Sequence, residues 1–390
     1  MTESADIIVV GAGVQGASLA FHLARRGADV LVLERETVAS GATGRSSGFV
    51  RMHYDLESES RLAFLSYPYY LAWDEIVGSG DCGFVKTGFL EIVPADQVDN
   101  LRANVEMHRR IGIDARTVGP DEVAELCPGI VTDDVVAAAY EPSSGYADPT
   151  GTASGFLAAA RRLGARVAQG RRVARVLLDG ERVSGVETDG GSVSARVVVD
   201  AAGAWAGILA ATAGLDVPIS TWRHDTAYFG LPSGRRADFP IVIDEINGDY
   251  FRPEGSELML VGLESGNEIG GSPDRPLLGL HEGSVDEMIE GVCRRAPWME
   301  AGTLRTAHGG QDGITPDQKM ILGAAGPEGF YLVCGMSGTG FKTAPAIGAT
   351  MAELILDGRT TTADISDFAL DRFAQGRPIR PEHSYGMIWR

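Results

Sequence analysis

The sequence predicts an α/β fold, α+β overall, with one domain on a mainly parallel sheet and a discontinuous second domain on a mainly antiparallel sheet. Three observations support this prediction. A strand–turn–helix–strand pattern occupies residues 6–34, glycine-rich turns follow apolar strands near residue 200 and at 335–348, and short alternating strands fill 82–140 and 216–300. Turns of this kind at both ends and in the middle of a chain indicate a domain assembled from separate segments.

The first pattern, "DIIVVGAGVQGASLAFHLARRGADVLVLE", is typical of a Rossmann-type dinucleotide site. An apolar strand over residues 7–10 leads into a GxGxxG turn, a helix and a second strand that ends at Glu34. The first glycine makes the turn, the second lets the backbone approach a pyrophosphate, and the third lets the helix pack on the sheet. Glu34 can accept hydrogen bonds from ribose hydroxyls. The alternative is a glycine-rich turn with no ligand. The turn residues are Gly11, Gly13, Val14, Gln15 and Gly16.

The segment after Glu34 favours FAD over NAD as the dinucleotide. An NAD enzyme usually continues into another strand and helix, whereas here "ASGATGRSSGF" is too polar and small for a core. Two further glycine-rich segments, "VVVDAAGAW" and "GMSGTGFKTAPAIG", follow strands later in the chain. Three such segments, spread over the whole sequence, fit one long ligand that runs through the domain. An NAD-dependent dehydrogenase stays as the less favoured alternative.

The domain boundaries follow from the same pattern of predicted strands and turns. We expect the cofactor domain to use the segments with dinucleotide-type features, which are 1–81, 141–215 and 301–375. The substrate domain takes the antiparallel segments, 82–140 and 216–300. Residues 376–390 form a C-terminal tail, and their sequence does not decide between a loose and a packed arrangement.

Composition excludes several classes of partner. The formal net charge of -19 argues against nucleic acid and anionic membranes. We expect no signal peptide and no membrane span, because no apolar run reaches the roughly 20 residues that a spanning helix needs. The four cysteines show no CxxC spacing and the histidines are dispersed, which predicts reduced thiols, a cytoplasmic location and no metal site.

With these motifs the chain resembles the D-amino-acid oxidase superfamily, and within it the sarcosine oxidase and glycine oxidase branch, including the sarcosine oxidase beta subunit. The resemblance runs from about residue 6 to about residue 358. Besides the motifs quoted above, it rests on four segments: "GATGRSSGFVRMHY", "FVKTGFLEI", "YFRPEG" and "GITPDQKMILG".

The resemblance implies which residues would contact FAD. The pyrophosphate would lie over the GxGxxG turn, the ribose beside Glu34 and Arg35, and the adenine beside Val173. Gly203 and Trp205 would flank the pyrophosphate or the ribityl chain. The flavin ring would lie between two loops, whose residues are Thr43, Gly44, Arg45, Ser46 and Ser47 in the first and Gly338, Thr339, Gly340, Phe341 and Lys342 in the second. The second loop opens a helix, so it offers positive potential where reduced flavin gains negative charge.

The resemblance also implies a substrate site. Arg51 matches the family arginine that binds the substrate carboxylate, and Lys342 matches the lysine that binds the same group from the other side. Without the resemblance, Arg51 could equally form a surface ion pair and Lys342 could be a solvated residue at a helix start. Tyr250 matches an aromatic residue of the pocket, with an ordinary strand tyrosine as the alternative. Weaker pocket candidates, chosen by strand period or by nearness to a motif, are His53, Arg252, His308 and Gln311.

The chain departs from the family pattern at four positions. Gly310 and Arg45 stand where some members carry the cysteine or histidine that bonds to the flavin, so we expect noncovalent FAD. Leu260 replaces a lysine that activates oxygen, which leaves oxygen, a quinone or a redox partner protein open as electron acceptor. Glu264 replaces a pocket histidine, which makes it a candidate substrate contact for a bulkier or basic amine.

Together these features predict FAD-dependent oxidation of a C–N bond in a small-molecule amino acid or secondary (N-alkyl) amine. Hydride would pass to flavin N5 and the resulting imine would hydrolyse in water. Two alternatives stay open: oxidation of a 2-hydroxy acid, whose carboxylate the same two cations could hold, and a flavin-binding beta-type subunit of a larger amine dehydrogenase complex.

Overall fold

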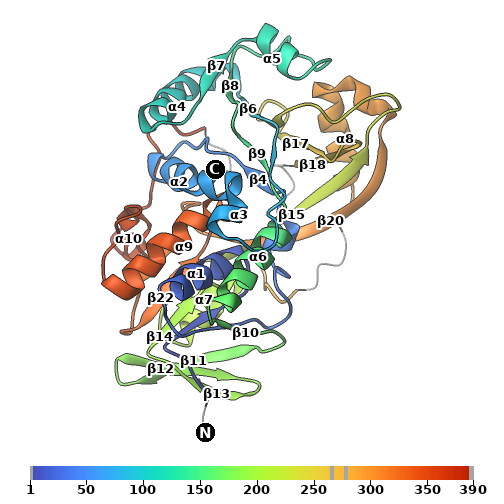
Figure 1. Ribbon diagram of the computed structural model, residues 1–390. Coiled ribbons are helices and arrows are strands. Elements are labelled where there is room, and N and C mark those ends of the chain that lie inside the picture. Colours follow the sequence, from blue (N-terminus) through green and yellow to red (C-terminus); the bar gives the residue numbers. More distant parts are fainter. Residues whose placement is uncertain (1–2, 264–267, 276–279, 386–390) are drawn as a thin grey trace.

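The structure is a computed structural model that describes residues 3–263, 268–275 and 280–385. A six-stranded sheet forms the base of the cofactor domain (Figure 1). Its first five strands are parallel, and only the last pairing is antiparallel. In spatial order these strands are β10 (Arg166–Ala168), β3 (Val30–Leu33), β2 (Ile7–Val10), β14 (Val197–Asp200), β22 (Phe330–Cys334) and β21 (Ile321–Ala324).

Apolar residues cover both faces of this sheet. On one face Val9 and Val32 join a core with the three helices α1 (Val14–Arg25), α6 (Pro149–Arg162) and α9 (Gly340–Asp357). On the other face Ile8 and Leu31 pack under α7 (Ala206–Ala211) and a four-stranded sheet. That sheet contains β1 (Glu3–Ser4), β13 (Gly191–Ser194), β12 (Arg182–Thr188) and β11 (Val173–Asp179). Because both faces are covered, the strands read as continuous apolar runs instead of alternating ones.

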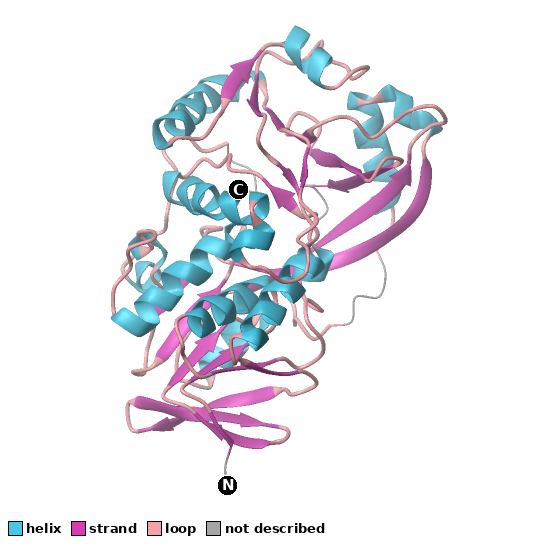
Figure 2. Ribbon diagram, viewed as in Figure 1, coloured by secondary structure: helices cyan, strands magenta, loops and turns pink. Residues whose placement is uncertain are grey.

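The second domain is built on a nine-stranded sheet, which lies above the cofactor domain in Figure 2. Apart from one parallel pairing, its neighbouring strands are antiparallel. The strands are β19 (Glu268–Ile269), β15 (Ser220–Gly230), β18 (Leu258–Leu263), β17 (Asp249–Glu254), β16 (Ile241–Asp244), β6 (Phe89–Ile92), β8 (Ala138–Glu141) and β7 (Arg116–Val118), with β20 (Thr303–Ile314) also paired to β15. The predicted fold class is therefore confirmed.

Helices and a small sheet complete the two domains. The small sheet holds β4 (Phe49–Val50), β9 (Gly145–Tyr146) and β5 (Val85–Lys86). The remaining helices are α2 (Glu57–Leu71), α3 (Trp73–Ile76), α4 (Val98–Ile111), α5 (Pro120–Leu126), α8 (Ser284–Arg295) and α10 (Asp371–Ala374). Asp148 caps α6, because its side chain accepts a hydrogen bond from the Thr150 N–H at the start of the helix. In the described part of the chain, no helix combines the length and the apolar character that crossing a bilayer requires.

One strand does not follow the expected division of the chain. Residues 303–314 lie in a segment that we assigned to the cofactor domain, yet β20 pairs with β15 from Ser220 to Gly230. The strand thus belongs to the nine-stranded sheet along its whole length, and it brings Gln311 and Asp312, near its far end, to the boundary between the domains. The residue pattern that predicts a strand does not reveal which sheet the strand will join.

The described part of the tail packs against the body. α4 holds it, because Asn104 Nδ2 donates to the His383 carbonyl at 2.9 Å and Asn100 Nδ2 donates to the Ser384 carbonyl at 3.0 Å. Tyr385 is buried, and its hydroxyl lies 2.8 Å from His53 Nε2. The four cysteines are free thiols, three of them buried, as expected.

Candidate active site

A cavity of about 630 Å³ opens at the carboxyl edge of the parallel sheet, where ligands of open α/β sheets bind. Val10, Leu33, Ala201 and Cys334, at or just after the ends of four parallel strands, all line it. Predicted site residues supply much of the rest of the wall: Gly11, Gly13, Val14, Gln15, Glu34, Arg35, Thr43, Arg45, Ser46, Ser47, Arg51, Val173, Gly203, Trp205, Tyr250, Gln311, Gly338, Gly340, Phe341 and Lys342. The fold therefore brings all three glycine-rich segments to one cavity.

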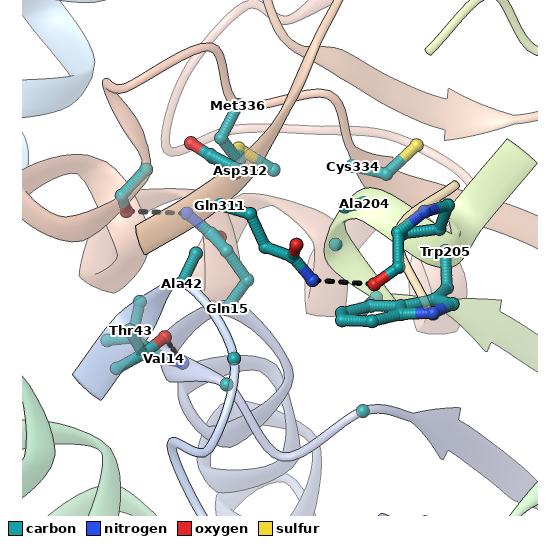
Figure 3. Close-up of a pocket in the computed structure, with 18 of the residues that line it drawn as sticks. Val14, Gln15, Ala42, Thr43, Ala204, Trp205, Gln311, Asp312, Cys334 and Met336 are labelled. Carbon is teal, nitrogen blue, oxygen red and sulfur yellow. Dashed lines mark hydrogen bonds between the residues drawn. The ribbon is translucent and has the colours of Figure 1, made fainter. Parts of the chain in front are cut away.

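The first turn is packed so closely that only glycine fits at two of its positions. Gly11 has φ of +107°, and a Cβ there would lie 2.4 Å from the Ala201 carbonyl oxygen. A Cβ on Gly16 would lie 2.1 Å from the Gly11 carbonyl oxygen, so Gly16 serves helix packing and does not line the cavity. At the start of α1, the Val14 N–H donates to Thr43 Oγ1 at 3.0 Å (Figure 3). The turn and the loop that follows Glu34 are thus held together.

Glu34 is fixed by the backbone that it faces. One carboxylate oxygen accepts from the Ala12 N–H and the other from the Glu36 N–H, both at 2.8 Å. The side chain is 9% exposed and borders the cavity, where its remaining lone pairs can accept from a ribose. The contact of Glu34 with the ribose stays a prediction.

The two loops that were expected to enclose the flavin ring are ordered by their own contacts. Arg45 Nη1 donates to the Gly41 carbonyl at 3.0 Å, and a Cβ on Gly44 would lie 2.5 Å from the Ala39 carbonyl oxygen. In the later loop the Gly338 N–H donates to Asp312 Oδ2 at 3.0 Å. Gln15 Nε2 joins the loop to the first turn by donating to the Gly340 carbonyl at 2.7 Å (Figure 3). Gly44 and the fully buried Thr339 shape these loops from behind the cavity wall.

Two buried cations share the cavity. Arg51 follows β4 and is 3% exposed, and Lys342 lies in the first turn of α9 and is 7% exposed. The Tyr54 ring neighbours both, with its centroid 4.4 Å from Arg51 Cζ and 5.6 Å from Lys342 Nζ. Burial, together with the charge of Arg51, holds the pKa of Lys342 well below its ordinary value. The carboxylates of Glu59 and Asp312 act in the opposite direction, and a bound anion would add to their effect.

Tyr250 lines the same cavity from β17. Its ring meets Phe49 edge-on, with centroids 5.3 Å apart, and a Cβ on Gly262 of β18 would lie 2.2 Å from its phenol oxygen. Gly262 therefore makes room for the tyrosine. Burial raises the pKa of Tyr250 to about 12, so the phenol is neutral near pH 7 and can serve as a hydrogen-bond donor.

Three weaker candidates do not line the cavity. Arg252 is buried and donates through Nε to the Ser47 carbonyl at 2.7 Å, so it braces the loop that follows Glu34. His308 lies beside Tyr228, with ring centroids 6.1 Å apart. His53 is buried behind Arg51, whose Nη1 donates to the His53 carbonyl. The fourth candidate, Gln311, does line the cavity, and Glu264 lies outside the described residues.

The histidines are less dispersed in space than in sequence. The rings of His53 and His108 lie 4.5 Å apart, and Glu141 is close enough that one ligand atom from each of the three falls within 4.8 Å of the others. These side chains also hold the backbone after Arg51. Glu141 Oε2 accepts from the Met52 N–H at 3.0 Å, and His108 Nε2 lies 2.8 Å from the Tyr54 carbonyl.

Sequence reasoning missed several residues of the site. Asp312, Asp274, Trp222 and His224 line the cavity, and Tyr54 stands behind the two cations. Trp222, His224 and Asp274 lie outside the recognised motifs; the pairing of β15 with β20 places the first two, and the loop after β19 places Asp274. Asp312 directly precedes "GITPD", so its nearness to that motif was an available signal.

The cavity fits an FAD molecule. The glycine turn leaves its backbone uncovered by side chains, Glu34 faces the cavity, and the wall continues without a break from this end to the loop at Gly338. A side chain on Gly310 would begin 3.3 Å from Arg45 Cβ and 3.4 Å from His224 Nε2, both of cavity-lining residues. Glycine and arginine at these two positions provide no nucleophile for the flavin, which agrees with noncovalent binding.

Comparisons with known proteins agree with this site. The family model described as FAD-dependent oxidoreductase matches residues 6–354. Human mitochondrial sarcosine dehydrogenase is 28% identical over 389 residues, which cover 96% of this chain and 42% of the dehydrogenase. The chain thus spans less than half the length of that relative.

Solved structures extend the likeness to the whole fold. An L-proline dehydrogenase from P. horikoshii superposes with a TM-score of 0.89 at 27% identity, covering 97% of this chain and all of that one. A glycine oxidase from Geobacillus kaustophilus superposes with a TM-score of 0.84 at 25% identity, covering 95% and 99%. These likenesses confirm the expected resemblance and FAD as the cofactor.

The position of Glu34 leads to a test of cofactor binding. Replacing Glu34 with alanine removes the acceptor for two backbone N–H groups and for the ribose. We expect FAD affinity to fall about 10- to 100-fold, which corresponds to the free energy of ~1–2 hydrogen bonds to a charged group. Titration of the apoprotein with FAD, followed by quenching of flavin fluorescence, measures this change. Glu181→Ala, at an exposed residue in the turn between β11 and β12 that does not line the cavity, is the control. Equal affinities for the two variants would contradict the assigned role.

Proposed function

Because the chain belongs to the family of FAD-dependent oxidoreductases, we propose that it oxidises the C–N bond of an amino acid or secondary amine that carries a carboxylate. The observation that carries this proposal is the presence of two buried cations, Arg51 and Lys342, on the wall of the cavity that fits FAD. The names of the similar proteins support it, since sarcosine, L-proline and glycine are all amino acids.

A carboxylate is the ligand that best suits this pair. The guanidinium of Arg51 can donate two parallel hydrogen bonds to one carboxylate, whereas Lys342 acts as a point charge. In the empty site, burial and then the charge of Arg51 lower the pKa of Lys342, and the neighbouring carboxylates of Glu59 and Asp312 do not offset these effects. A substrate carboxylate would compensate both charges and favour the protonated lysine.

The remaining walls suit the uncharged part of such a substrate. Phe49, Ile243 and Tyr250 provide aromatic and aliphatic surface in the cavity. When bound, FAD supplies the hydride acceptor. The protein's task is to fix the substrate by its carboxylate so that the carbon next to a neutral amine faces the flavin, and to keep bulk water away from this carbon. The resulting imine hydrolyses in water, and no side-chain base is required at the carbon.

The same two cations would hold the carboxylate of a 2-hydroxy acid, which remains the second candidate substrate class. A role as the flavin-binding part of a larger protein or complex is supported by the length comparison, because the matched dehydrogenase extends well beyond this chain. Leu260, which the resemblance aligns with the family's oxygen-activating lysine, is fully buried in one cluster with Phe49 and Tyr250 and carries no charge. We therefore propose a quinone or redox protein as acceptor ahead of oxygen.

Anaerobic mixing tests the substrate class directly. The FAD-loaded protein is mixed with N-alkyl amino acids, with D- and L-amino acids and with 2-hydroxy acids, and loss of the flavin absorption band is followed. We expect bleaching by at least one amino acid or secondary amine and none by the hydroxy acids. Bleaching by hydroxy acids alone would establish the alternative, and no bleaching by a broad amine panel would refute the proposal.

Lys342→Met should leave the protein yellow and weaken the binding of carboxylate substrates. Loss of one charge-assisted hydrogen bond predicts a rise of about 10- to 100-fold in the dissociation constant. The readouts are the flavin content of the purified variant and the substrate dependence of flavin reduction. Lys86→Met is the matched control, because Lys86 is exposed on β5 and does not line the cavity. If Lys342→Met loses FAD, the lysine serves the cofactor instead.

The lowered pKa of Lys342 predicts how carboxylate binding depends on pH. The empty site loses the lysine proton at a lower pH than an exposed lysine does, and a bound carboxylate raises this pKa again. Affinity is therefore full below the pKa of the empty site and falls as pH rises through it, by up to about tenfold per pH unit. Titrations with a non-reactive carboxylate between about pH 6 and pH 10 measure this fall in affinity. The range lies below the usual lysine pKa of ~10.4 because the pKa of Lys342 is lowered. A flat profile in the wild type, or the same slope in Lys342→Met, would contradict this account.

A further inference from the structure

We infer that residues 272–275 form a clasp from the substrate domain that retains FAD, with Asp274 as its latch on the cofactor domain. The clasp follows β19 at the edge of the nine-stranded sheet. Pro273, Asp274 and Arg275 line the FAD cavity, so the clasp is part of the cavity wall. This inference rests on FAD binding and does not depend on the substrate proposed above.

The base of the clasp is held within its own domain. Gln311, at the inner end of β20, donates through Nε2 to the Pro273 carbonyl at 2.7 Å, and Figure 3 shows this bond beside Trp205. Just before the clasp, the Gly270 N–H donates to the Thr221 carbonyl of β15 at 2.7 Å. Gln311 is 9% exposed, so its bond to Pro273 is shielded from water. These contacts fix where the clasp leaves the sheet.

The latch crosses to the other domain. Asp274 Oδ1 accepts from Arg35 Nη1 at 3.0 Å and from Trp205 Nε1 at 2.8 Å. The Arg35 guanidinium lies over the Trp205 ring, with Cζ 3.9 Å from the centroid. The hydrogen bond from Trp205, followed by that from Arg35, lowers the pKa of Asp274, so the carboxylate stays charged at neutral pH. Arg35 follows β3 and Trp205 follows β14, which makes the latch a contact between the two domains.

A surface ion pair is the alternative reading, because the side chains of Arg35 and Asp274 are 32% and 52% exposed. Such pairs usually contribute little to stability. This pair differs because two donors converge on one oxygen and because all three side chains line the cavity. Departure of FAD past this wall requires the domains to separate here, so the latch is expected to slow FAD release even if it adds little to global stability.

The test measures FAD dissociation from the holoprotein. After dilution, the rise in fluorescence of free FAD gives the release rate for the wild type, Asp274→Asn and Asp274→Ala. We expect FAD release to be about 3- to 10-fold faster in Asp274→Ala, a change that corresponds to the free energy of ~1 hydrogen bond. The increase should be smaller in Asp274→Asn, because asparagine keeps one acceptor oxygen. Asp357→Asn is the matched control, since the Arg26–Asp357 pair has similar exposure and lies away from the cavity.

Two further measurements separate a latch from general loosening. Salt screens exposed ion pairs, so raising the ionic strength should speed FAD release from the wild type and from Asp357→Asn but hardly from Asp274→Ala. Trp205→Phe keeps a ring under Arg35 and removes the N–H donor, so its effect should be non-additive with that of Asp274→Ala. Release rates of the Asp274 variants equal to that of the control, or full additivity with Trp205→Phe, would overturn the inference.

Discussion

The placement of two positive charges in a buried cavity is the constraint on which the rest of this site depends. Arg51 and Lys342 come from segments almost 300 residues apart, and each is nearly inaccessible to water. Burying like charges together is costly, and the carboxylates of Glu59 and Asp312 offset only part of this cost, since the pKa of Lys342 stays lowered. The surrounding structure therefore has two tasks, which are to hold both side chains in place and to leave space between the domains for an anionic ligand.

Backbone contacts carry out the first task. Lys342 stands in the first turn of α9 and donates to the Gly338 carbonyl at 3.1 Å, while Gln15 ties the same turn to α1. The segment after Arg51 has no regular structure, so buried side chains satisfy its polar groups instead: Glu141 for Met52 and His108 for Tyr54. The tail reaches the same region through Tyr385 and His53. The cation pair thus depends on elements from both domains and from the end of the chain.

Local signals made the cofactor domain predictable. The GxGxxG turn and Glu34 act within one strand–helix–strand unit, so their roles follow from spacing and steric fit. Contacts between distant segments were not predictable in this way. The pairing of β20 with β15, the position of Asp274 against Arg35 and Trp205, and the packing of Tyr385 on His53 all depend on which strands and loops meet in three dimensions. Arg252 shows the limit of strand period as a guide, because period 2 predicts that it shares a face with Tyr250, and yet it braces a loop instead of lining the cavity.

The most direct measurement compares substrates that differ only in the carboxylate. The FAD-loaded protein is mixed without air with proline and pyrrolidine, and with sarcosine and dimethylamine, across a range of concentrations. The account predicts that in at least one pair the amino acid bleaches the flavin while the amine without a carboxylate does so far more weakly. Equal rates and concentration dependence within a reactive pair would contradict it, because Arg51 and Lys342 would then have no part in holding the substrate.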